Sequence, residues 1–302
     1  RAFIRSSIGA GLLAGSGLAM APMGKVLGSP SEMNDPDLVA ILGGEPDIMF
    51  DRAIQQFGGM GAFVKKGQKV VVKPNIGWDA TPERAADTNP ILVKRIIEHC
   101  FSAGASEVMV FDHTCNEWTA CYKNSGIERA VKETRGKIVP GNSERYYQEV
   151  NIPSGKSLRK AKVHELIFDS DVFINVPVLK NHGGAKMTIS MKNLMGIVWD
   201  RRYWHQNDMH QCIADFAAYR QPDLNIVDAY RVMKQSGHRG TSVNDVRTMK
   251  AQLISTDMVA VDTAATKLFG MDPDKVTYLG LAENAGGGTM NLDSLNISRL
   301  KV

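Results

Sequence analysis

The chain has 302 residues, 43% of them hydrophobic, which is enough to bury a large core as one α/β domain or two lobes. Its 36 lysines and arginines face 32 aspartates and glutamates, and two of the basic residues, Arg1 and Arg5, belong to a distinct N-terminal segment. This even balance, without a basic stripe or an aromatic RNA-binding motif, argues against a protein that binds a nucleic-acid backbone. We therefore expect no nucleic-acid partner.

Residues 1–22 have the pattern of an export signal, with a basic start, a short apolar middle and small residues near Ala19 and Ala21. The pattern is similar to a twin-arginine leader whose first residues precede this numbering. Its apolar run of about 16 residues is shorter than the ~20 that span a bilayer. We expect an exported protein, periplasmic or on the outer face of the cytoplasmic membrane; an amphipathic N-terminal helix is the alternative.

Pro22 directly follows Ala21 and disfavours cleavage there, so a retained leader is one hypothesis. A retained leader would keep the protein close to a membrane or to a partner subunit. The remainder, 23–302, is expected to form a single α/β domain.

The four cysteines, Cys100, Cys115, Cys121 and Cys212, include no C-x-x-C pair and no ferredoxin-type run of four. An iron–sulfur cluster held by this chain alone is therefore not expected. Cys115 and Cys121 could form a disulfide after export, and reduced, partly buried thiols are the alternative.

Alternating strand and helix signals predict an α/β fold. Residues 46–57 suit a first helix and Val70–Val72 a short buried strand. A helix over 90–103, with Asn89 as N-cap and Pro90 at its first position, leads to a strand at 107–111. Strand, helix and strand in this order form a βαβ unit, which requires a parallel pair of strands. We therefore predict a mostly parallel twisted sheet flanked by helices.

The second half of the chain continues the alternation. After a short helix at 126–134 comes a polar stretch at 136–162, which we expect to be a surface insertion. Further elements are expected as follows: a strand at 172–176, a helix from about His210, a strand at 224–227 that ends at Asp228, a loop at 233–245 that could fold over a site, a strand at 252–254, and a helix at 258–269 capped by Asp257.

The segment 176–196 is the richest in reactive side chains. A buried strand runs into Pro177, and the paired glycines Gly183 and Gly184 let the backbone approach a ligand closely. If the stretch after the two glycines is extended, its alternate residues face the same side of the strand. A surface loop with solvated lysines is the alternative. The segment gathers three lysines, a histidine and two hydroxyls: Lys180, Lys186, Lys192, His182, Thr188 and Ser190.

The sequence of this segment, LKNHGGAKMTISMKNLMG, resembles the central motif of the family known as domain of unknown function 362. Four further pieces agree in the expected order: VVVKPN at 70–75, DMHQCIADF at 208–216, LNIVDAY at 224–230 and STDMVAVDTAATKLFG at 255–270. The resemblance implies an α/β domain, which many members couple to a ferredoxin-type iron–sulfur module. No such module is recognised in this sequence.

Polar residues follow the carboxyl ends of the predicted strands, where ligands bind in parallel α/β sheets. We expect convergence there of groups from five strands, and assign acid/base roles to His182, Lys180 and Asp112. A lysine of depressed pKa would instead serve as a base or a Schiff-base nucleophile. The expected ligand-binding residues are Lys73, Asn75, His113, Lys186, Lys192, Asn193, Asp228 and Asp262.

Several of these residues have alternative roles. Asp262, inside an apolar helix, is expected to pair with a lysine of the central segment. Asp228 could equally accept bonds from neighbouring backbone amides, and Asp257 is expected to act mainly as a helix cap. His205 and His210 are candidates for a divalent metal, although their spacing does not place two imidazoles on one helix face.

Two functional interpretations follow. The first is an exported α/β enzyme that binds a small anionic molecule through its lysines and uses His182 for acid/base chemistry. The alternative is a non-catalytic redox accessory, or a subunit of a membrane-associated complex. Neither the substrate nor the cofactor follows from the sequence, which has no Walker loop, G-x-S-x-G or H-E-x-x-H motif.

Overall fold

The computed structural model describes residues 35–302. The predicted leader, residues 1–22, lies outside the described residues, so export stays a prediction. Within the described part, no helix has both the length and the apolar character needed to cross a membrane.

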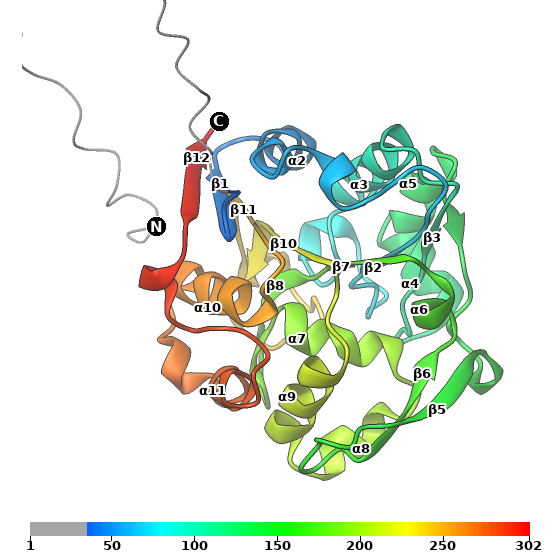
Figure 1. Cartoon of the computed structure of the whole chain (residues 1–302), viewed down its shortest axis with the longest axis vertical. Coiled ribbons are helices and arrows are strands. Elements are labelled where there is room, and N and C mark those ends of the chain that lie inside the picture. The colour runs from blue at the N-terminus through cyan, green and yellow to red at the C-terminus, as the bar shows by residue number, and fades with distance from the viewer. Residues whose placement is uncertain (1–34) are drawn as a thin grey trace, which may run out of the picture.

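The fold is a ten-stranded sheet with helices on both faces (Figure 1). The strand order is β12-β1-β11-β10-β7-β2-β3-β4, and the pairs from β10 through β4 are parallel. The strands of this path are β1 (Leu38–Leu42), β2 (Lys69–Pro74), β3 (Glu107–Val110), β4 (Lys137–Ile138), β7 (Val172–Val176), β10 (Leu224–Met233), β11 (Val246–Ser255) and β12 (Ile297–Lys301). The prediction of a mostly parallel α/β sheet is confirmed.

The helices follow the hydrophobic patterns of the sequence. The predicted cap of α3 is confirmed, because the Asn89 side chain accepts from the backbone N–H of Ile91. Asp257 likewise caps α10 by accepting from the N–H of Ala260. The helices are α2 (Pro46–Gln55), α3 (Pro90–Ser102), α4 (Trp118–Asn124), α5 (Ile127–Lys132), α6 (Leu166–Asp169), α7 (Ser190–Asn193), α8 (Arg201–Gln206), α9 (Met209–Tyr219), α10 (Met258–Phe269) and α11 (Thr277–Asn284).

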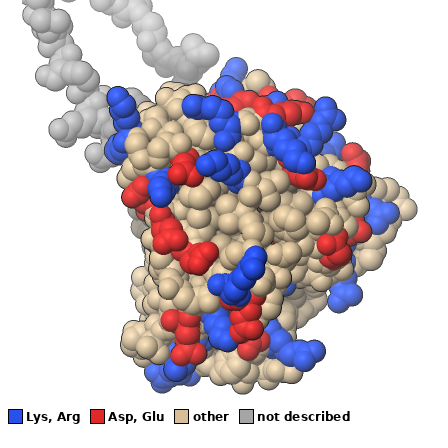
Figure 2. Space-filling model, turned by 90° about the vertical axis from the view of Figure 1, so that its right-hand side faces the viewer, with Lys and Arg blue, Asp and Glu red and all other residues tan. Residues whose placement is uncertain are grey.

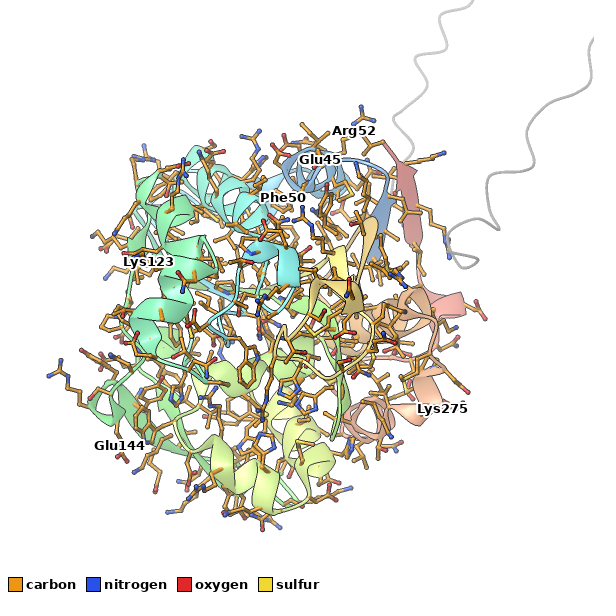
Figure 3. The ribbon with its side chains drawn as sticks, turned by 180° about the vertical axis from the view of Figure 1, so that it is seen from behind. Glu45, Phe50, Arg52, Lys123, Glu144 and Lys275 are labelled. Atoms are coloured by element: carbon orange, nitrogen blue, oxygen red, sulfur yellow. The ribbon has the colours of Figure 1, made fainter. Side chains whose placement is uncertain are left out.

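Alternation along the strands divides the core into two layers. In β2, Val71 faces the layer that contains α7, α9, α10 and α11, whereas Val70 and Val72 face the layer that contains α2 and α3. Side chains of a strand point alternately to its two faces, so a strand covered by helices on both sides must be apolar throughout. Figure 3 shows Phe50 of α2 directed into the body and Arg52 directed outward, and Phe50 is fully buried.

The polar stretch 136–162 begins in the main sheet with β4 and then leaves it. β5 (Tyr147–Asn151) and β6 (Lys160–His164) form a separate antiparallel pair beside α8 (Figure 1). The outer face near this region carries interspersed charges of both signs (Figure 2). Exposed pairs such as Lys160–Glu149 and Lys132–Glu128 account for part of that mixture.

The segment after β7 differs from the prediction. Instead of a loop, β8 (Val178–His182) and β9 (Lys186–Thr188) form an antiparallel hairpin that turns at Gly183 and Gly184. The extended stretch ends with β9 at Thr188, and the chain coils into α7 from Ser190. The physical reason is tertiary: the carboxylate of Asp262 accepts from the backbone N–H groups of Ser190 and Met191, which fixes a helix start there.

Candidate functional site

A cavity of about 1150 Å³ opens at the carboxyl ends of β2 and β3. Its floor is formed by residues that follow these strands and by α7, and its sides by α8, the β5–β6 pair and the loop around His238. Large cavities that gather polar groups at this edge are the usual ligand sites of parallel α/β sheets. Nine lysines and arginines line the cavity against four carboxylates: Lys73, Arg159, Lys160, Lys162, Lys180, Lys192, Arg201, Arg202 and Arg239, against Asp112, Glu144, Glu149 and Asp200.

Most of the side chains predicted from strand ends meet in this cavity. The predicted residues that line it are Lys73, Asn75, Asp112, His113, Lys180, His182, Lys192, Asn193 and His205. Four predicted residues do not line it: Lys186, Asp228, Asp262 and His210. Each of these four has a structural reason for its different position.

Asp228 does not follow a strand end, because β10 continues to Met233. Its buried carboxylate accepts from the N–H of Asn89 (2.8 Å) and of Tyr230 (3.0 Å), the alternative role noted above. Burial raises its pKa to about 6.

Asp257 lies at the opposite edge of the sheet, because β11 runs antiparallel to β10.

Asp262 does not pair with a lysine. Its carboxylate is fully buried and accepts hydrogen bonds from the first backbone amides of α7, and burial raises its pKa to about 7.

Lys186 is exposed at the start of β9, where its φ of 65° belongs to the tight turn of the hairpin. Of the residues predicted to alternate, Thr188 and Lys192 line the cavity, whereas Lys186 does not.

The two candidate metal histidines do not converge. His205, in α8, lines the cavity, whereas the ring of His210, in α9, stacks on Tyr278. Among residues 35–302, the structure brings together no group of three or more His, Cys, Asp and Glu side chains that could hold a metal ion. The suggested metal site at these histidines is therefore not supported.

Lys73 and Asp112 form a buried ion pair beneath the cavity. Nζ of Lys73 lies 2.8 Å from Oδ1 of Asp112, and the two side chains are 0% and 2% exposed. The ammonium also donates to the carbonyl of Pro74 and to Oδ1 of Asn193. Asp112 in turn accepts from the N–H of Ile76 through Oδ2. The ion pair and these hydrogen bonds hold both side chains in place at the floor of the cavity.

Asn193 connects this ion pair to Lys180. Its Oδ1 accepts from both Lys73 and Asn75, each at 2.9 Å, and its Nδ2 donates to Oδ1 of Asn175. Oδ1 of Asn75 accepts from Nζ of Lys180 at 3.0 Å, and Lys180 also donates to the carbonyl of Ala86. Burial lowers the pKa of Lys180, and the nearby Asp87 carboxylate opposes that effect.

Lys192 differs from these two lysines. It lines the cavity and is half-buried, yet among the described residues no hydrogen-bond acceptor or carboxylate pairs with it. Burial, with the positive charges of Arg201, Lys180 and Lys73, lowers its pKa to about 7. Near neutral pH a large fraction of this amine is therefore uncharged and nucleophilic.

The hydrogen bonds of His182 fix its tautomer. The backbone N–H of Ala185 donates to Nδ1 at 3.0 Å, so the neutral ring carries its proton on Nε2. Burial and the nearby Lys192 and His238 lower its pKa to about 2. The ring stacks on His238 with centroids 4.0 Å apart. His182 is therefore a neutral side chain with a hydrogen-bond donor at Nε2, and its acid/base role stays a prediction.

His113 has the opposite tautomer. Its Nδ1 lies 3.0 Å from the carbonyl oxygen of Val198 and must donate, which leaves Nε2 unprotonated. The ring stacks on Trp199 at 4.8 Å, and burial with the charge of Arg201 lowers its pKa to about 4. The two histidines thus provide one acceptor nitrogen and one donor N–H in the same cavity.

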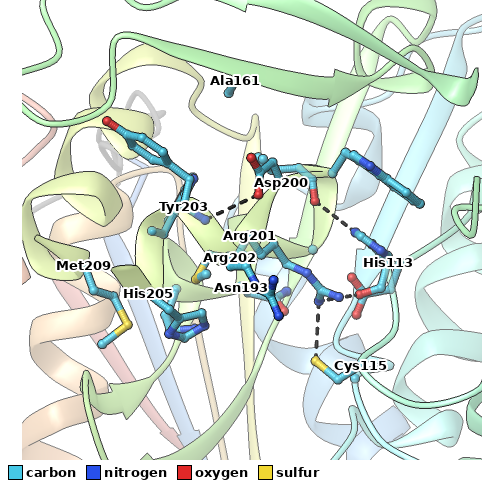
Figure 4. Close-up of a pocket in the computed structure, with 18 of the residues that line it drawn as sticks. His113, Cys115, Ala161, Asn193, Asp200, Arg201, Arg202, Tyr203, His205 and Met209 are labelled. Carbon is cyan, nitrogen blue, oxygen red and sulfur yellow. Dashed lines mark hydrogen bonds between the residues drawn. The ribbon is translucent and has the colours of Figure 1, made fainter. Parts of the chain in front are cut away.

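Arg201 was not anticipated from the sequence. Its guanidinium donates to the carbonyls of His113 (2.8 Å) and Thr114 (2.7 Å) and lies 3.4 Å from Sγ of Cys115 (Figure 4). These bonds hold the segment after β3 against α8. No local pattern marks Arg201, because its partners are backbone atoms nearly ninety positions away.

The cavity also contains residues that the sequence pattern indicated only in part. His238 and Arg239 lie in the loop that was expected to cover a site, and both line the cavity. Of the two states predicted for Cys115 and Cys121, the structure has the free thiols, and Cys115 is exposed at the cavity.

Gly196 lies against the buried ion pair. A Cβ there would come within 2.6 Å of Nζ of Lys73 and would collide with Oδ1 of Asp112. We expect Gly196→Ala to lower the free energy of unfolding by about 1–3 kcal/mol, as overpacking does, measured by urea denaturation. Gly183→Ala is the matched control, because a Cβ there meets no atom within 4 Å. Equal losses in the two variants would contradict this account of the ion pair.

Comparisons with known proteins agree with this architecture. A family model described as "Domain of unknown function (DUF362)" matches residues 70–267. A thylakoid-associated protein of Synechocystis sp. is 27% identical over 241 residues, which is 77% of this chain and 73% of that protein.

Two solved structures are similar to part of this chain. The lactate racemase apoprotein from Thermoanaerobacterium thermosaccharolyticum has a TM-score of 0.50 at 12% identity, over 76% of this chain and 56% of that one. A protein from Thermotoga maritima has a TM-score of 0.48 at 12% identity, over 80% of this chain and 60% of that one. The chain thus spans little more than half the length of these two proteins, and at such low identity the likeness concerns the fold alone. Because the family model covers most of the chain, including the whole strand-end cavity floor from Lys73 to Asn193, the chain belongs to the DUF362 family.

Proposed function

We propose that this protein binds a small organic anion in the strand-end cavity and transfers a proton to or from it. The observation that carries this proposal is the combination of Lys192, a half-buried cation without a counterion, with two neutral histidines of opposite tautomer. An unpaired buried charge is costly, so a bound anion would stabilise it.

The remaining lining residues support the same chemistry. Lysines and arginines outnumber carboxylates around the cavity, and the outer carboxylates Glu144 and Glu149 are already paired with Lys162 and Lys160. His113 would accept a proton at Nε2, and His182 would donate a hydrogen bond from Nε2 to an oxygen of the ligand. A bound anion would also raise the pKa of His113 toward neutrality, because opposite charge stabilises the imidazolium.

The pH dependence of anion binding tests the first half of the proposal. With lactate, which stays ionised between about pH 6 and pH 9, we expect affinity to fall as the pH rises through about 7, because Lys192 then loses its charge. Titration calorimetry with Lys192→Met should show binding about ten- to hundredfold weaker at pH 6, the loss of one charged hydrogen bond.

Two further variants complete this experiment. Lys192→Arg keeps its charge and should bind lactate without the change near pH 7. Lys94→Met, which removes a surface lysine paired with Glu133, should behave like the wild type. If lactate and a panel of similar carboxylates bind equally well to wild type and Lys192→Met, the anion site is not at Lys192. Lactate serves here as a probe, suggested by the name of one structural neighbour.

A second candidate is a non-catalytic role in a membrane-associated complex, together with the predicted export. It is favoured by one observation, the similarity to a protein named for its association with thylakoids. Fractionation of native cells would test it. Recovery of the chain with membranes and with stoichiometric partner proteins would support this role, whereas recovery as a free protein would contradict it.

A further inference from the structure

The three inner lysines of the cavity have different partners, and this difference indicates which of them is available for chemistry. Lys73 is held by Asp112, Asn193 and the carbonyl of Pro74. Lys180 is held by Asn75 and the carbonyl of Ala86. Lys192 has no such partner among residues 35–302, so its amino group is free to approach a ligand.

The backbone beneath Lys192 is firmly held. The carboxylate of Asp262 fixes the first amides of α7, and the side chain of Asn193 is bonded on both ends. A reactive group gains most from a rigid element, because little conformational entropy is then lost in the reaction. The backbone of Lys192 is thus held in place, whereas its amino group has no partner among residues 35–302.

The surroundings of Lys192 suit an anionic carbonyl compound. An amine reacts with a carbonyl only in its uncharged form, and burial among like charges keeps a large fraction of Lys192 uncharged near neutral pH. The positively charged side chains around Lys192 would hold the carboxylate of the ligand. The Nε2–H of His182 provides a donor for the carbonyl oxygen, whose charge grows as the amine attacks.

We propose that Lys192 forms an imine with a 2-oxo carboxylate bound in this cavity. Nζ attacks the carbonyl carbon, and the proton that the nitrogen loses passes to the oxygen, giving a carbinolamine. That hydroxyl then leaves as water with a second proton from the nitrogen, and a C=N bond forms. One amine and one ketone thus give one imine and one water, without any oxidant or reductant. This inference rests on the anion site proposed above.

Trapping with borohydride tests the imine. The full chain is incubated with pyruvate near pH 7, reduced, digested and analysed by mass spectrometry. We expect the reduced pyruvate adduct on Lys192 at about tenfold or more the level on any surface lysine, because a surface lysine with a pKa near 10.4 is almost wholly charged. Lys192→Arg should lose this adduct, and Lys94→Arg should retain it.

Lactate binding separates the two proposals, because lactate has no carbonyl that can form an imine. An adduct spread evenly over surface lysines, or concentrated on Lys180, would overturn the imine proposal. Absence of an adduct on a protein that binds lactate would also overturn it while leaving the anion site intact. If neither lactate nor pyruvate binds and no adduct forms, both proposals fail.

Discussion

Replacing Asp112 with alanine should lower the free energy of unfolding by about 3–5 kcal/mol, the cost of leaving one member of a buried ion pair without its partner. The ammonium of Lys73 is fully buried and would keep only Asn193 and the carbonyl of Pro74 as acceptors. The N–H of Ile76, which donates to Oδ2 of Asp112, would lose its partner too. Urea denaturation followed by circular dichroism measures the change.

Two further variants make this test specific. Replacing both partners, Lys73→Met with Asp112→Leu, should recover much of the loss, because an apolar pair needs no compensating charge. Glu149→Ala breaks the exposed pair with Lys160 and should change the free energy of unfolding by about 1 kcal/mol or less. If Asp112→Ala were as mild as Glu149→Ala, the ion pair would not be the structural support of the cavity.

Replacing His113 with glutamine should slow proton exchange on a bound 2-oxo acid by about 10²–10⁴-fold, the usual contribution of a general base. The imine proposed at Lys192 would withdraw electrons from the neighbouring methyl group of pyruvate, and Nε2 of His113 is the unprotonated nitrogen available to take the proton. The measurement is the loss of the methyl signal of pyruvate in D₂O, followed by nuclear magnetic resonance.

Glutamine is an uncharged side chain of similar size, so the stability of the variant and its lactate affinity should stay close to those of the wild type. His99→Gln is the matched control, because His99 pairs with Asp51 on the far helical layer and does not line the cavity. Exchange that persists in His113→Gln would assign the base to another group. If wild-type protein exchanges no faster than free lysine, the catalytic half of the proposed function is wrong.

Short sequence patterns predicted the strands and the helix that place the residues after β2 and β3 in the site. The run Val70–Val72 before Lys73, and the Asn89–Pro90 start of α3, depend on hydrophobic burial and on capping bonds between neighbours in the chain. The parallel pairing of β2 with β3 followed from the helix between them. For this reason Lys73, Asn75, Asp112 and His113 were correctly expected at one edge of the sheet.

The errors arose where a distant residue decides the local structure. The stretch after Gly184 alternates like a strand, yet α7 begins at Ser190 because Asp262, more than seventy residues later, accepts its amide protons. The prediction for Asp228 assumed that β10 ends there, but pairing with β8 and β11 extends the strand to Met233.

The sequence by itself determined the fold class, the family and the group of lysines and histidines that face the strand-end cavity, because these depend on apolar runs, caps and motif order. Tertiary structure alone decided the state of each group. It paired Lys73 with Asp112 and left Lys192 without a partner, and it set opposite tautomers in His113 and His182. The physical reason is that charge state and tautomer depend on burial and on hydrogen bonds from residues far away in the chain, which no spacing within the sequence encodes.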